Sequence, residues 1–354
     1  MASQSIISPL SPAHVGSSSD VTATHWETFP LGPFNPPRLW VGLWQLSSTA
    51  WGSAPAARIR EAMARHVDQG YTAFDMVNLL SGQFQEHLPP RTVLGGTKWC
   101  VFKLGEELSR STVETAVRER MTRMRTSHLD FLQFYWQDYS NKGYMTALRY
   151  LLDLQADGLI TAIGLVNFDA ARTDEICTQL GPGAIVSNQV QFSLIDTRPL
   201  HGMADVCGKH NIKLLTYGTF CGGFLADAWL DRPEPDPYSG TLTPSQRKYL
   251  DAITRAWGDW ALFQQLLAVL RKIGDRHGGA TIANVAVRWV LDHPFVGAVL
   301  VGTRLGVSEH PEDNLNVFKF RLSDADRADI EAVLDRSNGR KMITLIGDCG
   351  AEYR

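Results

Sequence analysis

Polar, charged or aromatic residues close eight successive apolar runs of the sequence. Side chains of these kinds can bind and orient a small molecule and exchange protons with it. A carboxylate beside an ammonium group, when both are buried, can serve as an acid or as a cation. Such a pair is also often only a structural salt bridge. The closing residues are Trp44, Asp75, Lys98, Tyr135, Asn167, Gln189, Tyr217 and Arg304.

The runs that carry these residues are predicted to be β-strands. Most are almost continuously apolar, which is typical of parallel strands covered on both faces. The predicted strands span residues 38–46, 72–76, 92–99, 130–136, 159–168, 184–192, 212–218 and 296–302.

Amphipathic segments with helical spacing lie between the predicted strands. One face carries Ile59, Ala62, Met63, His66 and Val67, and a second carries Val113, Val117, Met121 and Met124. Ser111 with Glu114 predicts a capping box at the start of the second helix. Further stripes are Tyr144, Leu148, Leu151 and Leu152, and Ile330, Val333 and Leu334.

Strands alternating with helices predict a single (β/α)₈ (TIM) barrel, whose active site lies at the C-terminal ends of the strands. An open doubly wound sheet is the alternative, but no G-x-G-x-x-G motif follows the first strand. We expect a loose N-terminal tail over residues 1–37, the barrel over 38–340, and a C-terminal tail over the barrel at 341–354. A long insertion follows the seventh strand, with a helical stretch from Pro244 to about His277.

The composition of the 354-residue chain is that of a soluble globular protein, with 44% hydrophobic and 20% charged residues. The net charge of −3 argues against nucleic acid or an anionic membrane as partner. Five scattered cysteines without a C-x-x-C pair indicate a reduced, cytoplasmic protein. We expect a small-molecule substrate and a monomer or weak oligomer.

Several motifs together resemble the aldo-keto reductase family, over nearly the whole chain from about Arg38. They are GLWQLSS, AFDM, GGTKW, IGLVNF, SNQVQFSLIDTRP, LLTYGTFCGGFLADAWL, VGTRLGVSEHPEDN and GDCGAEYR. The last motifs are similar to a plant and fungal branch. The resemblance implies a (β/α)₈ barrel that reduces carbonyl compounds with NADPH.

The resemblance also implies positions for the cofactor. Asn167 and Gln189 match the residues that bind the nicotinamide carboxamide, and Tyr217 matches the ring that stacks on the nicotinamide. Val166 stands where the family usually has Ser, which removes one hydrogen bond. The adenosine 2′-phosphate and adenine would lie against Gly302, Thr303, Arg304, His310 and Asn314. Because His310 replaces a frequent Arg, the preference for NADPH over NADH is expected to be weaker.

The catalytic set that the resemblance implies is incomplete. Family members use Asp, Tyr, Lys and His, and here Asp75 and Lys98 match. Leu80 stands in place of the Tyr that donates the proton, and Tyr135 in place of the His. Leu has no proton to give, so the family mechanism cannot operate unchanged.

Three interpretations remain open. In the first, the protein is a reductase of a carbonyl or conjugated enone on a large apolar or aromatic, secondary-metabolite-like substrate. Tyr135 would then contact Lys98 and act as acid, unless it merely fills the space of the missing His. The second is a cyclase, isomerase or dehydratase, and the third a non-catalytic binding subunit. Proposed pocket residues are Trp44, Leu80, Trp99, Trp136, Phe220 and Trp229, although several of these tryptophans can equally be barrel packing.

Other chemistries have weaker support. Glu86 and His87 can supply an acid, but an exposed helix face explains them as well. The ten histidines show no metal-ligand spacing. Cys100 and Cys221 are interpreted as packing thiols.

Overall fold

Eight parallel strands close into a barrel in chain order in the computed structural model, which describes residues 26–76, 93–103 and 108–354. Each strand pairs with its sequence neighbours, and the first pairs with the last. The predicted (β/α)₈ fold is therefore confirmed. The strands are β1 (Leu39–Gly42), β2 (Ala73–Asp75), β3 (Leu94–Val101), β4 (Leu129–Trp136), β5 (Ile160–Val166), β6 (Ser187–Gln191), β7 (Lys213–Tyr217) and β8 (Val296–Gly302).

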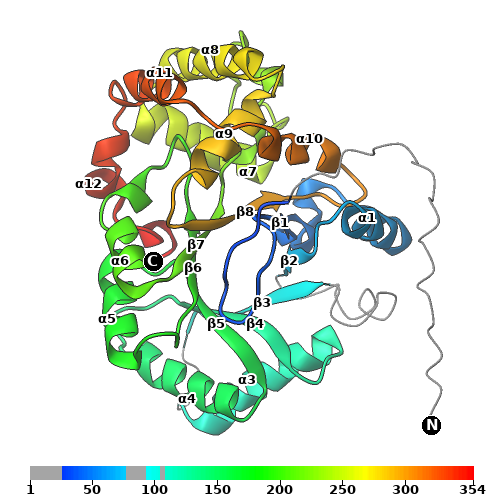
Figure 1. Ribbon diagram of the computed structural model, residues 1–354, viewed down its shortest axis with the longest axis vertical. Helices are drawn as coiled ribbons and strands as arrows, with labels where there is room; N and C mark the ends of the chain where they lie inside the picture. The colour runs from blue at the N-terminus through cyan, green and yellow to red at the C-terminus, as the bar shows by residue number, and fades with distance from the viewer. Residues whose placement is uncertain (1–25, 77–92, 104–107) are drawn as a thin grey trace, which may run out of the picture.

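Helices surround the sheet, so the strands are covered on their outer face (Figure 1). The principal helices are α1 (Ala56–Asp68), α3 (Arg110–Met124), α4 (Tyr144–Ala156), α5 (Ala170–Leu180), α6 (Met203–His210), α9 (Ile282–Leu291) and α11 (Asp324–Leu334). The apolar stripes predicted for α1, α3, α4 and α11 are largely buried. The cap of α3 was predicted wrongly. Its capping box is Ser109 with Thr112, because the helix begins at Arg110.

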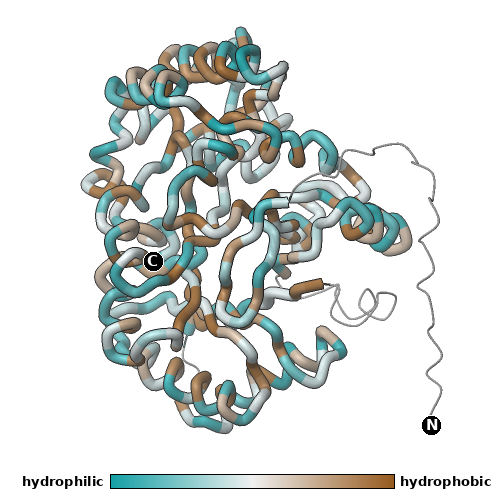
Figure 2. Tube along the Cα trace, in the orientation of Figure 1, coloured by the Kyte–Doolittle hydropathy of each residue, from teal (hydrophilic) through white to brown (hydrophobic). Residues whose placement is uncertain are grey.

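The long insertion after β7 is helical, as predicted. It contains α7 (Pro244–Asp251), a π-helical turn (Ala252–Trp257) and α8 (Trp260–Arg276). Figure 2 shows hydrophobic and hydrophilic positions alternating along α8, the pattern of a helix with one buried face. Among the described residues, no helix combines the length and hydrophobicity that spanning a membrane requires.

The N-terminal end of the barrel is closed by a hairpin. Isolated bridges join Thr28 to Pro37 and Leu31 to Phe34, and Leu31 is fully buried inside the barrel. Phe29 packs so closely on β8 that a Cβ at Gly297 would lie 2.3 Å from its ring. The expectation of a loose tail is therefore wrong for residues 26–37, because these apolar side chains fill the barrel floor.

Three short elements belong to the last part of the chain. They are α10 (Pro311–Leu315), which follows β8, and α12 (Met342–Ile346) and the single 3₁₀ turn η9 (Ala351–Tyr353) near the end of the sequence. Residues 348–354 cross the mouth of the barrel, where the side chains predicted to form the site gather.

Candidate active site

A buried ion pair lies in the interior of the barrel. Asp75 ends β2 and Lys98 lies on the adjacent strand β3, and the two side chains are only 4% and 7% exposed as whole residues. The Lys98 ammonium donates to Asp75 Oδ1 at 2.5 Å and also contacts Oδ2. The pair predicted from the sequence is thus present and shielded from water.

Two glutamines complete the surroundings of this pair. Gln133 on β4 donates through Nε2 to Asp75 Oδ1 at 2.7 Å, and Gln189 on β6 donates to the same oxygen at 3.2 Å. Gln189 also donates to Gln133 Oε1 at 2.7 Å. A carboxylate can only accept, so these contacts fix the orientation of both amides. Within the described parts of the chain no group donates to the carbonyl oxygen of Gln189, so this oxygen can accept a hydrogen bond from a ligand.

Replacing Lys98 with Met leaves a buried carboxylate without its cation. We expect the free energy of unfolding to fall by about 3–5 kcal/mol, as when one partner of a buried pair is removed. The double variant with Asp75→Asn and Lys98→Met removes both charges and should recover most of that loss. Urea denaturation of the wild type and both variants measures this. A single variant as stable as the wild type would contradict a charged pair.

The ends of β5 and β7 bring Asn167 and Tyr217 together. Asn167 follows β5 directly in a left-handed conformation with φ of 55°. Its Oδ1 accepts a hydrogen bond from the Tyr217 hydroxyl at 2.9 Å. Burial, with a smaller contribution from Tyr353, raises the pKa of Tyr217 well above its ordinary value. The hydroxyl therefore stays protonated and holds the Asn167 amide in place.

Tyr135 faces into the barrel mouth, but it does not contact Lys98 as the sequence suggested. On β4 the partner of Lys98 is Gln133, and Tyr135 pairs with Cys100 two residues farther along. The Tyr135 hydroxyl donates instead to the main-chain carbonyl of Tyr353 at 3.1 Å. Burial raises its pKa, so this phenol keeps its proton. The expected Tyr135–Lys98 contact is a wrong prediction.

The predicted pocket walls from β3 and β4 are also wrong. Successive side chains on a strand point to opposite faces, and Lys98 and Gln133 point inward. Trp99 and Trp136 therefore point outward, where Trp99 packs on Phe134 and Trp136 on Tyr144 of α4. Both are packing residues of the layer between strands and helices.

The remaining proposed pocket residues have different positions. Trp44 follows β1 in a 3₁₀ turn and is 55% exposed. Phe220, after β7, is partly buried against the core. Trp229 packs on Trp260 of α8 and on Phe224, within the insertion. Leu80, together with Glu86 and His87, lies outside the described residues.

The loop after β8 holds the residues predicted to bind the adenosine end of a dinucleotide. Arg304 lines a cavity of about 290 Å³ between this loop and the loop after β1. Hydroxyl-bearing residues line its other side, namely Ser47, Ser48, Thr49 and Ser53. Gly302 is exposed, Thr303 is buried, and His310 and Asn314 lie on or beside α10.

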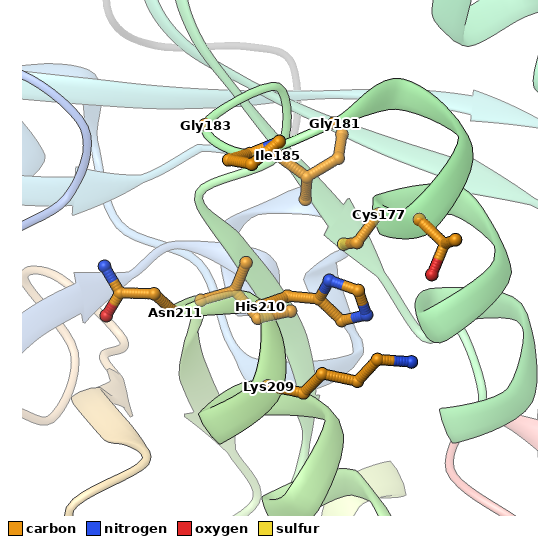
Figure 3. A pocket seen from close by; sticks show the side chains of 10 residues that line it. Cys177, Gly181, Gly183, Ile185, Lys209, His210 and Asn211 are labelled. Carbon is orange, nitrogen blue, oxygen red and sulfur yellow. The ribbon is translucent and has the colours of Figure 1, made fainter.

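A larger cavity, of about 410 Å³, lies at the opposite end of the barrel. It is formed by the loops that precede β6 and β7, and Figure 3 shows Lys209, His210 and Cys177 around it. Lys209 and His210 both bind Asp174, and burial raises the pKa of Cys177 to about 12. The described residues contain no group of three or more His, Cys, Asp or Glu side chains placed to hold a metal ion.

Two residues at the mouth were not singled out from the sequence. Tyr353 and Lys248 contact each other, with Lys248 Nζ donating to the Tyr353 hydroxyl at 2.7 Å. Lys248 comes from α7 in the insertion, far from Tyr353 in the chain. The GDCGAEYR motif marked the segment that holds Tyr353, but its spacing gave no role to the individual side chains.

The chain matches a known family over most of its length. The model of the aldo/keto reductase family matches residues 38–335. The chain belongs to the aldo/keto reductase family. The aldo-keto reductase YhdN of Bacillus subtilis is 23% identical over 321 residues, which cover 85% of this chain and 90% of that protein.

Other proteins resemble the chain over different lengths. Flagellar radial spoke protein 5 of Chlamydomonas reinhardtii is 33% identical over 181 residues, which cover 46% of this chain and only 33% of that protein. A glycerol dehydrogenase from Gluconobacter oxydans superposes with a TM-score of 0.70 at 21% identity, covering 89% of this chain and 96% of that one. An aldo/keto reductase from Klebsiella pneumoniae, solved with NADP and acetate, gives 0.65 at 18% identity, covering 88% and 96%.

Proposed function

We propose that this aldo/keto reductase family member binds NADPH and reduces a carbonyl group or conjugated enone on a large apolar or aromatic substrate. The observation that carries the proposal is the gathering of Asn167, Gln189 and Tyr217 at the mouth, beside the buried Asp75–Lys98 pair. The exposed ring of Phe102, which packs against Tyr135, supports an apolar substrate.

The free hydrogen-bonding groups at the mouth suit a nicotinamide carboxamide. A primary amide offers two N–H donors and one carbonyl acceptor. Gln189 retains its carbonyl oxygen as an acceptor, because its N–H groups bind Asp75 and Gln133. Asn167 uses Oδ1 for Tyr217, which leaves its Nδ2 donors for the carbonyl. Tyr217 is only partly buried and offers a ring face for stacking.

Bound NADPH supplies the hydride that adds to the substrate carbon. Tyr135 would give its hydroxyl proton to the carbonyl oxygen, and the resulting phenolate would recover a proton from water. Lys98 stays paired with Asp75 below the mouth and takes no part in the proton transfer. A conjugated enone would take the hydride at its β-carbon, and a polarised oxygen and a later solvent proton would then suffice.

A titration of tryptophan fluorescence with NADPH, and separately with NADH, tests the proposal. We expect micromolar NADPH binding and weaker NADH binding, because only NADPH has a 2′-phosphate that can accept hydrogen bonds from the Arg304 guanidinium. Arg304→Ala should weaken NADPH binding about tenfold to hundredfold, the usual effect of losing a hydrogen bond to a charged group, and should leave NADH binding unchanged. Arg255, an exposed arginine on the insertion, provides the matched Ala control.

Absence of NADPH binding up to about a millimolar, roughly −4 kcal/mol, would refute the reductase proposal. Equal loss of NADPH and NADH binding in the Arg304 variant would instead refute the role of Arg304. That outcome would leave the nicotinamide positions intact.

A further inference from the structure

Residues 348–354 form a strap across the barrel mouth, anchored at both ends. Glu352 forms a bidentate ion pair with Arg198. Arg198 is only 1% exposed and also binds Asp196. Gly350, with φ of +79°, lies against the backbone of Asn167, where a Cβ would come within 2.2 Å of the Asn167 carbonyl oxygen. Arg354 donates to that same carbonyl and packs over the Tyr139 ring.

Tyr353 spans the mouth from β4 to β7. Its main-chain carbonyl accepts hydrogen bonds from Tyr135 at 3.1 Å and Gln137 at 3.2 Å, at the end of β4. Its hydroxyl lies 3.1 Å from the Tyr217 hydroxyl, at the end of β7, and accepts from Lys248. The ends of β5 and β6, with Asn167 and Gln189, lie between these two points in the barrel order. Tyr353 therefore spans the part of the mouth between β4 and β7, which includes the strand ends proposed to bind the nicotinamide.

We propose that the 348–354 strap is an autoinhibitory latch, in which Tyr353 competes with the nicotinamide of NADPH for the mouth. The inference rests on the proposed function, since it assigns a regulatory contact to the same site. Cofactor and strap share Tyr217: its hydroxyl contacts the Tyr353 hydroxyl, and the ring that carries this hydroxyl is the one proposed to stack on the nicotinamide. The closed strap also holds the Tyr135 hydroxyl on a backbone carbonyl, so opening frees the acid together with the cofactor site.

Two substitutions at one position test the latch by NADPH titration. Tyr353→Phe removes the contacts with Tyr217 and Lys248 but keeps the ring, and Tyr353→Ala removes the ring as well. We expect NADPH to bind about tenfold more tightly to the Ala variant, and the Phe variant to lie between it and the wild type, as the loss of two ordinary hydrogen bonds predicts. Tyr238→Ala is the matched control, since Tyr238 is 87% exposed on the insertion.

Hydrogen exchange of the wild-type protein provides a readout besides affinity. The amides of Tyr353 and Arg354 donate within the turn to Gly350 and Ala351, so their exchange reports whether this turn stays formed. A strap released from the mouth loses the contacts that hold the turn in place, so NADPH should speed the exchange of these amides.

The outcomes separate the latch from the proposed function. NADPH that binds wild type and Ala variant equally, or that slows exchange in the strap, would overturn the latch alone. If neither protein binds NADPH, the proposed function fails and the latch fails with it. If the Ala variant binds NADPH and the wild type does not, the result supports both the latch and the proposed function.

Discussion

Replacing Tyr135 with Phe should lower the rate of NADPH-dependent carbonyl reduction by about 10²–10⁴, the usual contribution of a positioned general acid. The ring and its packing against Phe102 remain, so the variant lacks only the hydroxyl proton that would be donated to the substrate. NADPH should bind at least as well as before, because the variant also loses the hydrogen bond that holds Tyr353. Single-turnover consumption of NADPH with an aromatic ketone measures the chemical step, with Tyr238→Phe as control.

The pH dependence gives this prediction a second test. Burial raises the pKa of Tyr135, so the protonated form that can donate persists to more alkaline pH than for a free phenol. The rate of carbonyl reduction should therefore stay constant through neutral pH and fall only above pH about 10, the ordinary value. A Phe variant with full activity would remove Tyr135 as the acid and favour enone reduction or non-redox chemistry.

Introducing Tyr at Leu80 should raise the reduction of simple aldehydes by about 10²–10⁴. The family resemblance places its proton-donating Tyr at this position, which lies outside the described residues. The supporting pair is present, since Asp75 holds Lys98 in the barrel interior, and an ammonium group nearby stabilises a developing phenolate. Steady-state rates with small aldehydes and NADPH measure the gain.

Leu80→Phe is the matched control for this substitution, because it adds a ring without a hydroxyl. A gain in the Tyr variant alone would identify a functional remnant of the family site. Equal rates in both variants would show that Lys98, held by its contacts with Asp75, is not placed to support a donor at position 80.

The sequence predicted the barrel well because each strand carries its own signal. The strand bounds differ mostly by a few residues, and the largest error is at β1, which ends at Gly42 and is followed by a 3₁₀ turn at Trp44. The Asp75–Lys98 pair was also predicted, since both residues lie at or near the ends of apolar runs that face one interior.

Whether an individual strand side chain points into the barrel or toward the helices was harder to predict. Trp99 and Trp136 were assigned to the pocket because they are large and lie near strand ends. Side chains alternate between the two faces of a strand, so if Lys98 points into the barrel on β3, Trp99 must point outward. Gln133 gives the same information for β4, but an isolated Gln inside an apolar run is easily overlooked.

Contacts between segments that are far apart in the chain could not be predicted from the sequence. Tyr353 meets Tyr135, Tyr217 and Lys248 only because the strap folds back over the mouth, and no spacing along the chain encodes that approach. The hairpin at residues 26–37 was missed for a similar reason. Its Pro- and Gly-rich turns look like a tail until the burial of Phe29 and Leu31 is seen.

The sealed floor of the barrel bears on how this site has diverged. Phe29, Leu31 and Trp40 pack inside the lower barrel, so the apolar burial that they provide is gained at the end away from the chemistry. The exchanges that the family resemblance implies at the opposite end, at Leu80 and Tyr135, would leave the contacts of this floor unchanged. In evolutionary terms, such a floor would allow substitutions at the mouth to change the reaction without removing the buried contacts of the hairpin.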